Sequence, residues 1–98
     1  MLNLEDILKA IEKNRDRIKP FGVRQMGVFG SVVRGEQTEK SDLDFLVEFE
    51  NETFKSYMGL KFFLEELFGC RVDLVIREGI KPRLREPILS EVVYAKGF

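Results

Sequence analysis

The chain has 98 residues, a length that allows one small domain with a hydrophobic core. Its hydrophobic content of 44%, charged content of 34% and net charge of −1 describe an ordinary globule and exclude an overall signature of nucleic-acid binding. No apolar run approaches the length of a membrane span, and the first residues show no signal-peptide pattern. The single cysteine, Cys70, cannot form an internal disulfide. We therefore expect one domain over residues 1–98, in the reducing cytoplasm, away from membranes.

An amphipathic helix opens the chain. Asn3 can cap it, and it should end before Pro20, because the residue before a proline avoids helical geometry. Its single apolar stripe predicts packing against a core rather than a partner-binding face. The stripe consists of Leu4, Ile7, Leu8, Ile11 and Ile18. A turn and a strand over residues 23–29 follow.

Gly30 and Ser31 come directly after this strand, and a short helix should start at Ser31 and end at Gly35. Glycine lets a backbone turn tightly and approach a ligand, and the free N–H groups at the start of a helix attract anions. The serine hydroxyl can also bind a phosphate oxygen. The sequence thus predicts a phosphate-binding turn. Arg34 either neutralises a phosphate or pairs with a core carboxylate.

Asp42 and Asp44 open a second strand after a polar loop at residues 36–40. Side chains two residues apart in a strand share a face, so the two carboxylates project together. The opposite face carries the core residues Leu43, Phe45, Val47 and Phe49. Neighbouring carboxylates suit Mg²⁺, whereas a chain with no histidine and one cysteine gives no support for zinc. A phosphate-binding turn and a carboxylate pair together are what a nucleoside triphosphate with Mg²⁺ requires.

The second half predicts a helix, a strand and a final helix. Residues 51–53 form a loop and cap before a helix over residues 54–68, which should stop at Gly69. This helix is rich in aromatic residues, which either fill the core or leave an exposed patch for a partner. A strand over residues 70–76 follows. The final helix should run from residue 84 or 87 to residue 94.

Asp73 lies on the more polar face of the strand over residues 70–76, as Asp42 and Asp44 do on theirs. It is either a third site carboxylate or an ordinary solvent-facing residue. Ser41 is either a phosphate ligand or only a turn or capping residue. A basic cluster follows the strand and either contacts a triphosphate, docks an acidic or RNA-bound partner, or is simply solvated. This cluster consists of Arg77, Lys81, Arg83 and Arg85.

The motifs match a known family. Gly30-Ser31, ten residues and Asp42-x-Asp44 resemble the signature of the nucleotidyltransferase superfamily that includes DNA polymerase beta. The longer stretch FGSVVRGEQTEKSDLDFLV resembles the minimal nucleotidyltransferases, or MNT proteins, over nearly the whole chain. The order of elements predicts an α/β (α+β) fold, a small mixed β-sheet with helices packed on one side. The resemblance implies the polymerase-beta-like nucleotidyltransferase core.

The resemblance also implies a two-Mg²⁺ mechanism with ATP as substrate. Asp42, Asp44 and Asp73 would be the catalytic and metal-binding carboxylates. Gly30 and Ser31 would hold the β- and γ-phosphates, with Arg34 and Ser41 also in the phosphate-binding set. Asp73 would assist removal of the proton from an acceptor hydroxyl, which attacks the α-phosphate as pyrophosphate leaves.

The larger relatives carry a further domain that covers the nucleotide, for which 98 residues leave no room. The acceptor should therefore come from another protein or an oligomeric neighbour. MNT proteins typically pair with HEPN-domain RNase toxins, which implies an antitoxin that transfers AMP to a toxin side chain, commonly tyrosine. Two alternatives remain. The chain either masks its toxin by complex formation without catalysis, or modifies RNA ends or a small molecule.

Overall fold

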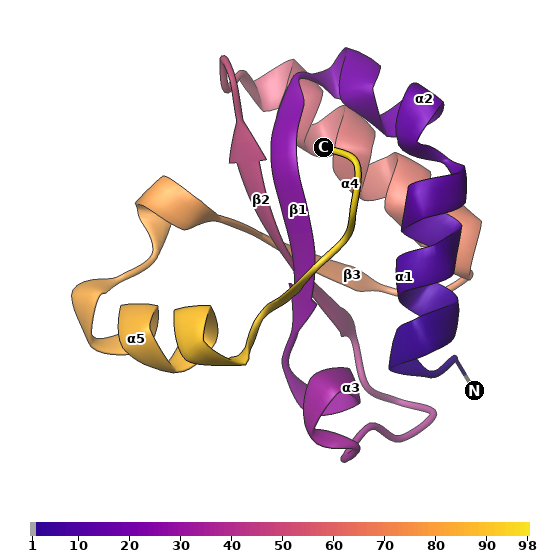
Figure 1. The fold of residues 1–98 in the computed structure, drawn as a ribbon. Helices are drawn as coiled ribbons and strands as arrows, with labels where there is room; N and C mark the ends of the chain where they lie inside the picture. Colours follow the sequence, from indigo (N-terminus) through magenta and orange to yellow (C-terminus); the bar gives the residue numbers. More distant parts are fainter. Residues whose placement is uncertain (1) are drawn as a thin grey trace.

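A computed structural model describes residues 2–98 (Figure 1). Its four strands form one mixed sheet in the order β3-β2-β1-β4. β1 (Val23–Phe29) is antiparallel to β2 (Leu43–Phe49) and to β4 (Val93–Tyr94), whereas β3 (Val72–Ile76) runs parallel to β2. The expectation of a small mixed α/β sheet is confirmed.

Three helices cover one face of this sheet, namely α1 (Leu4–Lys13), α2 (Arg15–Ile18) and α4 (Phe54–Phe68). The main hydrophobic core lies between them and the strands, and it contains the β2 residues that were predicted to face inward. Phe45, which is fully buried, stacks on Phe68 with ring centroids 5.7 Å apart. This core fixes β2, and therefore the residues at its beginning.

The first predicted helix is two helices. Asn3 caps α1 as expected, since its Oδ1 accepts a hydrogen bond from the Asp6 N–H at 2.8 Å. The helix breaks at Asn14, which leaves helical geometry and donates from its side-chain amide to the Ala10 carbonyl at 2.8 Å. Asparagine competes in this way with the backbone hydrogen bonds of a helix. A 3₁₀ turn, η1 (Lys19–Phe21), then leads into β1.

The helices α3 (Ser31–Arg34) and α4 have the bounds that their capping residues predict. Gly35 and Gly69 end them in the left-handed conformation, with φ of 71° and 66°. Thr53 caps α4, since its Oγ1 accepts a hydrogen bond from the Ser56 N–H at 3.0 Å. The capping residues therefore predicted the bounds of both helices correctly.

The end of the chain differs from the prediction. β3 starts at Val72 instead of residue 70, and Cys70 is a partly buried residue packed against the core. After the 3₁₀ turn η2 (Arg77–Gly79), helix α5 (Pro82–Glu91) begins with a proline in its first turn and continues through Pro87. The final helix therefore starts and stops earlier than predicted. Tyr94 belongs to β4, a strand that the sequence did not predict.

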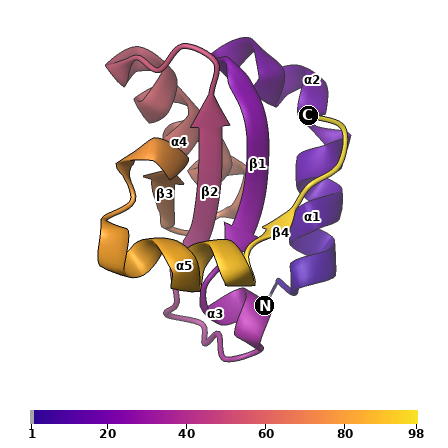
Figure 2. The same cartoon turned by 60° about the vertical axis from the view of Figure 1, so that its left-hand side comes forward.

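Helix α5 lies on the other face of the sheet, which corrects the expectation of helices on one side only (Figure 2). A second small core forms there from Phe29, Leu46 and Ile80, against which α5 packs. The helix contributes Ile88 and Leu89, followed by Val92. The physical reason is that β2 carries an apolar residue, Leu46, on the same face as Asp44, and this residue needs cover.

Among residues 2–98, no helix is both long and apolar enough to cross a membrane.

Candidate active site

The end of β1 and the beginnings of β2 and β3 bring Asp44 and Asp73 together. Phe29 pairs with Asp44 across the antiparallel strands, and Asp44 pairs with Asp73 across the parallel ones. Residues paired in this way lie side by side on one face of the sheet. The prediction that Asp44 and Asp73 share a face is confirmed. Asp44 is half-buried and Asp73 is exposed, on the face that α5 partly covers.

Asp42 lies just before β2 rather than within it, so its predicted place in the strand is wrong by one residue. Its side chain is exposed, and Oδ1 lies 3.4 Å from Nε of Arg71, the residue before β3. Sequence reasoning did not include Arg71 in the site. Asp42 is nevertheless near enough to influence the ionisation of Asp44.

Burial is the largest cause that raises the pKa of Asp44 to about 6, and the negative charges of Asp73 and Asp42 contribute to the same shift. Arg34 opposes this shift, whereas Glu91 adds to it. A half-buried carboxylate with an elevated pKa among other carboxylates is typical of a functional site. It also indicates that this place favours a bound cation.

The donor set fits Mg²⁺ better than a cation that needs a full protein cage. Among residues 2–98, no three histidine, cysteine, aspartate or glutamate side chains already converge as a metal site. Mg²⁺ commonly takes only one or two carboxylates and completes its coordination with water and substrate phosphates. The neighbouring carboxylates of Asp44 and Asp73, with Asp42 just before β2, are compatible with this requirement. Their metal-binding role stays a prediction.

The Gly30 turn lies against the carboxylate of Asp44. Gly30 has φ 85° and ψ −155°, a conformation that is open essentially only to glycine. A Cβ atom at this position would overlap the Asp44 carboxylate. The turn that was predicted to bind phosphate therefore touches a predicted metal ligand. Since α3 has only four residues, its dipole is weak, and the backbone of the turn matters more than we expected.

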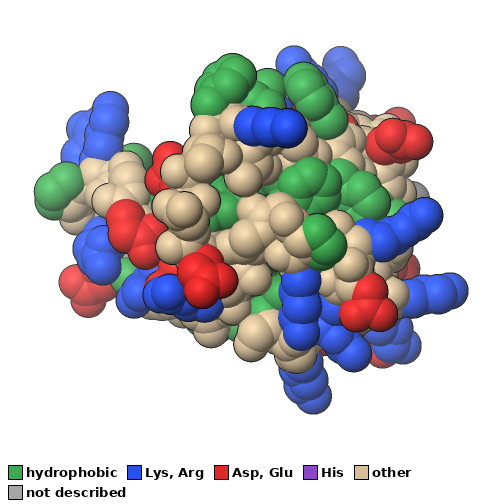
Figure 3. Space-filling model, turned by 90° about the horizontal axis from the view of Figure 1, so that it is seen from above, with side chains coloured by type: hydrophobic (Ala, Val, Ile, Leu, Met, Phe, Trp, Pro, Cys, Tyr) green, Lys and Arg blue, Asp and Glu red, His purple; other side chains and the backbone are tan. Residues whose placement is uncertain are grey.

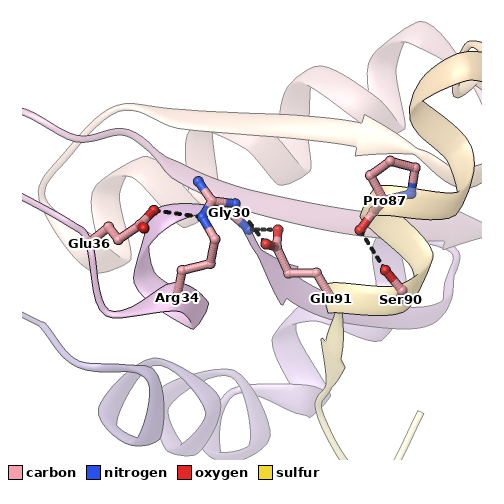
Figure 4. Close-up of polar contacts among 6 residues, drawn as sticks. All are labelled: Gly30, Arg34, Glu36, Pro87, Ser90 and Glu91. Atoms are coloured by element: carbon pink, nitrogen blue, oxygen red, sulfur yellow. Dashed lines mark hydrogen bonds and ion pairs between the residues drawn. The ribbon is translucent and has the colours of Figure 1, made fainter.

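Arg34 lies in α3 and forms two ion pairs (Figure 4). Its Nε donates to Glu36 Oε1 and its Nη1 to Glu91 Oε1, both at 2.7 Å. Both partners keep the guanidinium protonated, since they raise the pKa of Arg34 far above the neutral range. The structure thus shows ion pairs, although not with a core carboxylate, and the phosphate role of Arg34 stays a prediction.

Glu91, at the end of α5, was missed by sequence reasoning. Its Oε2 also accepts a hydrogen bond from the Gly30 N–H at 2.7 Å (Figure 4). Burial acts to raise the pKa of Glu91, but the hydrogen bonds from Arg34 and Gly30 outweigh it and lower this pKa below its usual value. No local pattern signals Glu91, because it lies 61 residues from Gly30.

Ser41 has a clear local role, because its Oγ accepts a hydrogen bond from the Thr38 N–H at 2.9 Å. This is the turn alternative, and a phosphate contact stays a prediction. The basic cluster is spread over η2, the start of α5 and α5 itself. Arg77 lies 3.9 Å from Glu48, and within residues 2–98 no ion pair joins the cluster to Asp42, Asp44 or Asp73.

The aromatic residues of α4 divide between core and surface. Most pack on the core, whereas Phe54 and Phe62 expose 81% and 59% of their area. Figure 3, which views the molecule from above, shows apolar side chains reaching the surface in several places, with lysine and arginine side chains mostly at the edges of this face. A surface depression lies beside Phe54, between α4 and β3, and is lined by Tyr57, Leu74 and Ile76 among others. An apolar patch for a partner stays a prediction.

The chain is similar to proteins of known family. The nucleotidyltransferase domain model matches residues 6–95. A curated relative, the protein adenylyltransferase MntA of Thermococcus cleftensis, is 44% identical over 96% of this chain and 97% of its own length. A solved structure described as a minimal nucleotidyltransferase has a TM-score of 0.80 and 43% identity, and the match covers 94% of this chain and 95% of that one.

A complex of a tri-AMPylated Shewanella oneidensis HEPN toxin with an MNT antitoxin also shares the fold. It has a TM-score of 0.66 and 16% identity, and the match covers 93% of this chain and 73% of that one. At this identity the likeness concerns the fold alone. The family model and the two close matches confirm the resemblance that the motifs indicated. The chain belongs to the nucleotidyltransferase domain family.

Proposed function

We propose that the chain is an ATP- and Mg²⁺-dependent protein adenylyltransferase, an antitoxin that transfers AMP to a tyrosine hydroxyl of a HEPN-type RNase toxin. The observation that carries this proposal is the position of Asp44, beside Asp73 and against the Gly30 turn. Carboxylates for a cation thus lie next to backbone that can approach phosphate. The relative from T. cleftensis and the complex with an AMPylated HEPN toxin support the choice of AMP and of this partner.

Asp42, Asp44 and Asp73 are the residues that would hold Mg²⁺. Bound Mg²⁺ supplies positive charge that stabilises the triphosphate and the reacting oxygens. The triphosphate would bind to the residues of the turn and its neighbours, which are Gly30, Ser31, Arg34 and Ser41. The contribution of the protein is mainly to position these groups and to balance charge.

In the transfer step, the acceptor hydroxyl oxygen forms a bond to the α-phosphorus of ATP. The bond from this phosphorus to the oxygen that bridges the α- and β-phosphates breaks, and pyrophosphate leaves. Asp73, the exposed carboxylate beside Asp44, can take the hydroxyl proton. The exposure of Asp42 and Asp73 leaves room for a hydroxyl that belongs to a separate protein.

The test is to incubate the protein with Mg²⁺, a candidate HEPN-type toxin and ATP labelled at the α-phosphate. Label on the partner that is lost in the Asp42→Asn/Asp44→Asn double variant supports the proposal. ATP labelled at the γ-phosphate is the control, because adenylyl transfer leaves that label on pyrophosphate. Replacing the candidate acceptor tyrosine of the toxin with phenylalanine should abolish labelling.

Masking of the toxin by complex formation is the second candidate, and the exposed Phe54 and Phe62 favour it, because large exposed apolar side chains commonly mark interfaces. The same experiment separates the two. If none of the four nucleoside triphosphates labels the partner, while a tight complex still forms and the double variant still neutralises the toxin, the enzymatic proposal fails and masking replaces it.

A further inference from the structure

Glu91 links the end of α5 to the turn after β1. Its two carboxylate oxygens accept from two different groups, the Gly30 N–H and Nη1 of Arg34, each at 2.7 Å. Within the last turn of α5, the Ser90 hydroxyl donates to the Pro87 carbonyl at 3.1 Å and closes the helix end that carries Glu91 (Figure 4). A charged acceptor makes such hydrogen bonds short and strong.

These contacts determine which donors remain for a phosphate. The Gly30 N–H donates to Glu91, so a phosphate at this turn would need other donors, such as those of Ser31. Arg34 donates with Nε to Glu36 and with Nη1 to Glu91, and it is half-exposed. A guanidinium has five N–H donors, so two ion pairs fix its orientation while its other donors stay usable.

We propose that Glu91 is a positioning residue of the nucleotide site, which holds the Gly30 turn and the Arg34 guanidinium in place and makes α5 part of that site. This inference rests on the proposed function, because it concerns the same triphosphate. Helix α5 packs on the sheet through the partly buried side chains of Ile88 and Leu89, with Val92 after it. Its position and the geometry of the phosphate-binding turn are therefore coupled through one carboxylate.

Glu91 could also have the opposite role, that of a competitor for the phosphate, and its removal would then have the opposite effect on ATP binding. A carboxylate bound to a backbone amide and to an arginine resembles a phosphate, so Glu91 would compete with ATP if the nucleotide needed these same donors. Removing Glu91 would then tighten ATP binding. Removing a positioning residue weakens it, since the turn and Arg34 lose their preferred arrangement. The sign of the effect distinguishes the two roles.

The experiment compares Glu91→Ala and Glu91→Gln with Glu86→Gln, an exposed residue of the same helix, as the matched control. The dissociation constant of ATP with Mg²⁺ is measured by calorimetry, and KM and kcat by AMP transfer. We expect Glu91→Ala to raise the dissociation constant and KM at least tenfold with a smaller change in kcat. Glu91→Gln should be intermediate, because its amide oxygen still accepts from Gly30 while its NH₂ group cannot accept from Arg34.

A second readout needs no nucleotide. In nuclear magnetic resonance spectra, the Gly30 amide proton should shift upfield in Glu91→Ala, shift less in Glu91→Gln and stay unchanged in Glu86→Gln. Tighter ATP binding by Glu91→Ala, or unchanged ATP binding with an unshifted Gly30 amide, would overturn the proposal. If wild-type protein binds ATP but transfers no AMP, the proposed function fails while calorimetry still decides on Glu91. If it binds no ATP, both fail.

Discussion

The backbone of Gly30 packs against the carboxylate of Asp44. A Cβ atom on residue 30 would lie 2.8 Å from Cγ of Asp44 and closer still to one of its oxygens. Because Phe29 pairs in register with Asp44, this contact is set by the β1–β2 ladder and not by a mobile loop. The turn predicted to bind phosphate and the carboxylate predicted to bind metal therefore form one unit.

Replacing Gly30 with alanine should damage both stability and activity. The new methyl group overlaps the Asp44 carboxylate, and the φ of 85° with ψ of −155° is strained for any residue with a Cβ. We expect a loss of about 1–3 kcal/mol in the free energy of unfolding, from backbone strain alone. AMP transfer should fall by about 100-fold or more, because displacement of a reacting group by about 1 Å has effects of this size. Urea denaturation and the labelling assay measure the two effects.

The matched control is Gly22→Ala, which also has a positive φ, 87°, but has no atom within 4 Å of the added methyl group. This substitution should cost roughly 1–2 kcal/mol from the left-handed conformation and leave transfer unchanged. If Gly30→Ala lost no more activity than Gly22→Ala, the close contact between Gly30 and the Asp44 carboxylate would not matter for AMP transfer.

Asp44 should reduce the stability of the metal-free protein at neutral pH. Its pKa is raised from 3.8 to about 6, so the unfolded chain ionises first as the pH increases. Stability attributable to this group is therefore complete below about pH 4, falls between about pH 4 and 6, and stays low above that range. Since Asp44 is only half-buried, solvent screening limits the effect to on the order of 1 kcal/mol.

The variant Asp44→Asn measures the destabilisation that the ionised Asp44 carboxylate causes. In the presence of a chelator it should be more stable than wild type at pH 7, by on the order of 1 kcal/mol, and the difference should vanish near pH 3.5. Denaturation curves of both proteins across this range give the comparison. Equal or lower stability of the variant at pH 7 would show that the carboxylates do not repel one another as their arrangement indicates.

Mg²⁺ should reverse this penalty in wild type. A cation beside Asp42 and Asp44 lowers the pKa of Asp44 and binds only the folded state. At a tenfold excess over its dissociation constant, Mg²⁺ should add about 1.4 kcal/mol, which raises the Tm by several degrees in a domain of this size. The Asp42→Asn/Asp44→Asn double variant should show no rise. In wild type, a chelator should remove both the stabilisation by Mg²⁺ and AMP transfer. If Mg²⁺ raised the Tm of wild type and of the double variant equally, the metal would bind somewhere else.

Much of the fold up to Gly69 follows from local sequence signals. Gly35 and Gly69 end their helices, and Asn3 and Thr53 begin theirs, because each of these residues makes its cap with neighbours within four positions. The register of β2 follows from its alternation, which places Phe45 in the core and Asp44 on the other face.

The rest depends on contacts between distant residues. β4 has only two residues and exists because it pairs with Gly27 and Val28, which no local pattern reveals. The place of α5 depends on Leu46, a residue in the preceding half of the chain. For the same reason, the sequence predicted that Asp44 and Asp73 share a face but could not find Glu91, whose partners Gly30 and Arg34 are more than fifty residues away.

Substitution of Ser31 and of Ser41, the two serines predicted to bind phosphate, should have different effects on ATP binding and on stability. Ser41→Ala removes an acceptor for the Thr38 N–H, so it should cost about 1 kcal/mol in stability and leave the KM for ATP within about twofold. Ser31 follows Gly30 at the start of α3. Ser31→Ala should therefore raise the KM for ATP several-fold, with a change in stability below about 0.5 kcal/mol. Denaturation and steady-state AMP transfer on both variants give the comparison. A several-fold rise in KM for Ser41→Ala, beyond its stability loss, would return Ser41 to the phosphate site, whereas an unchanged KM for Ser31→Ala would remove Ser31 from it.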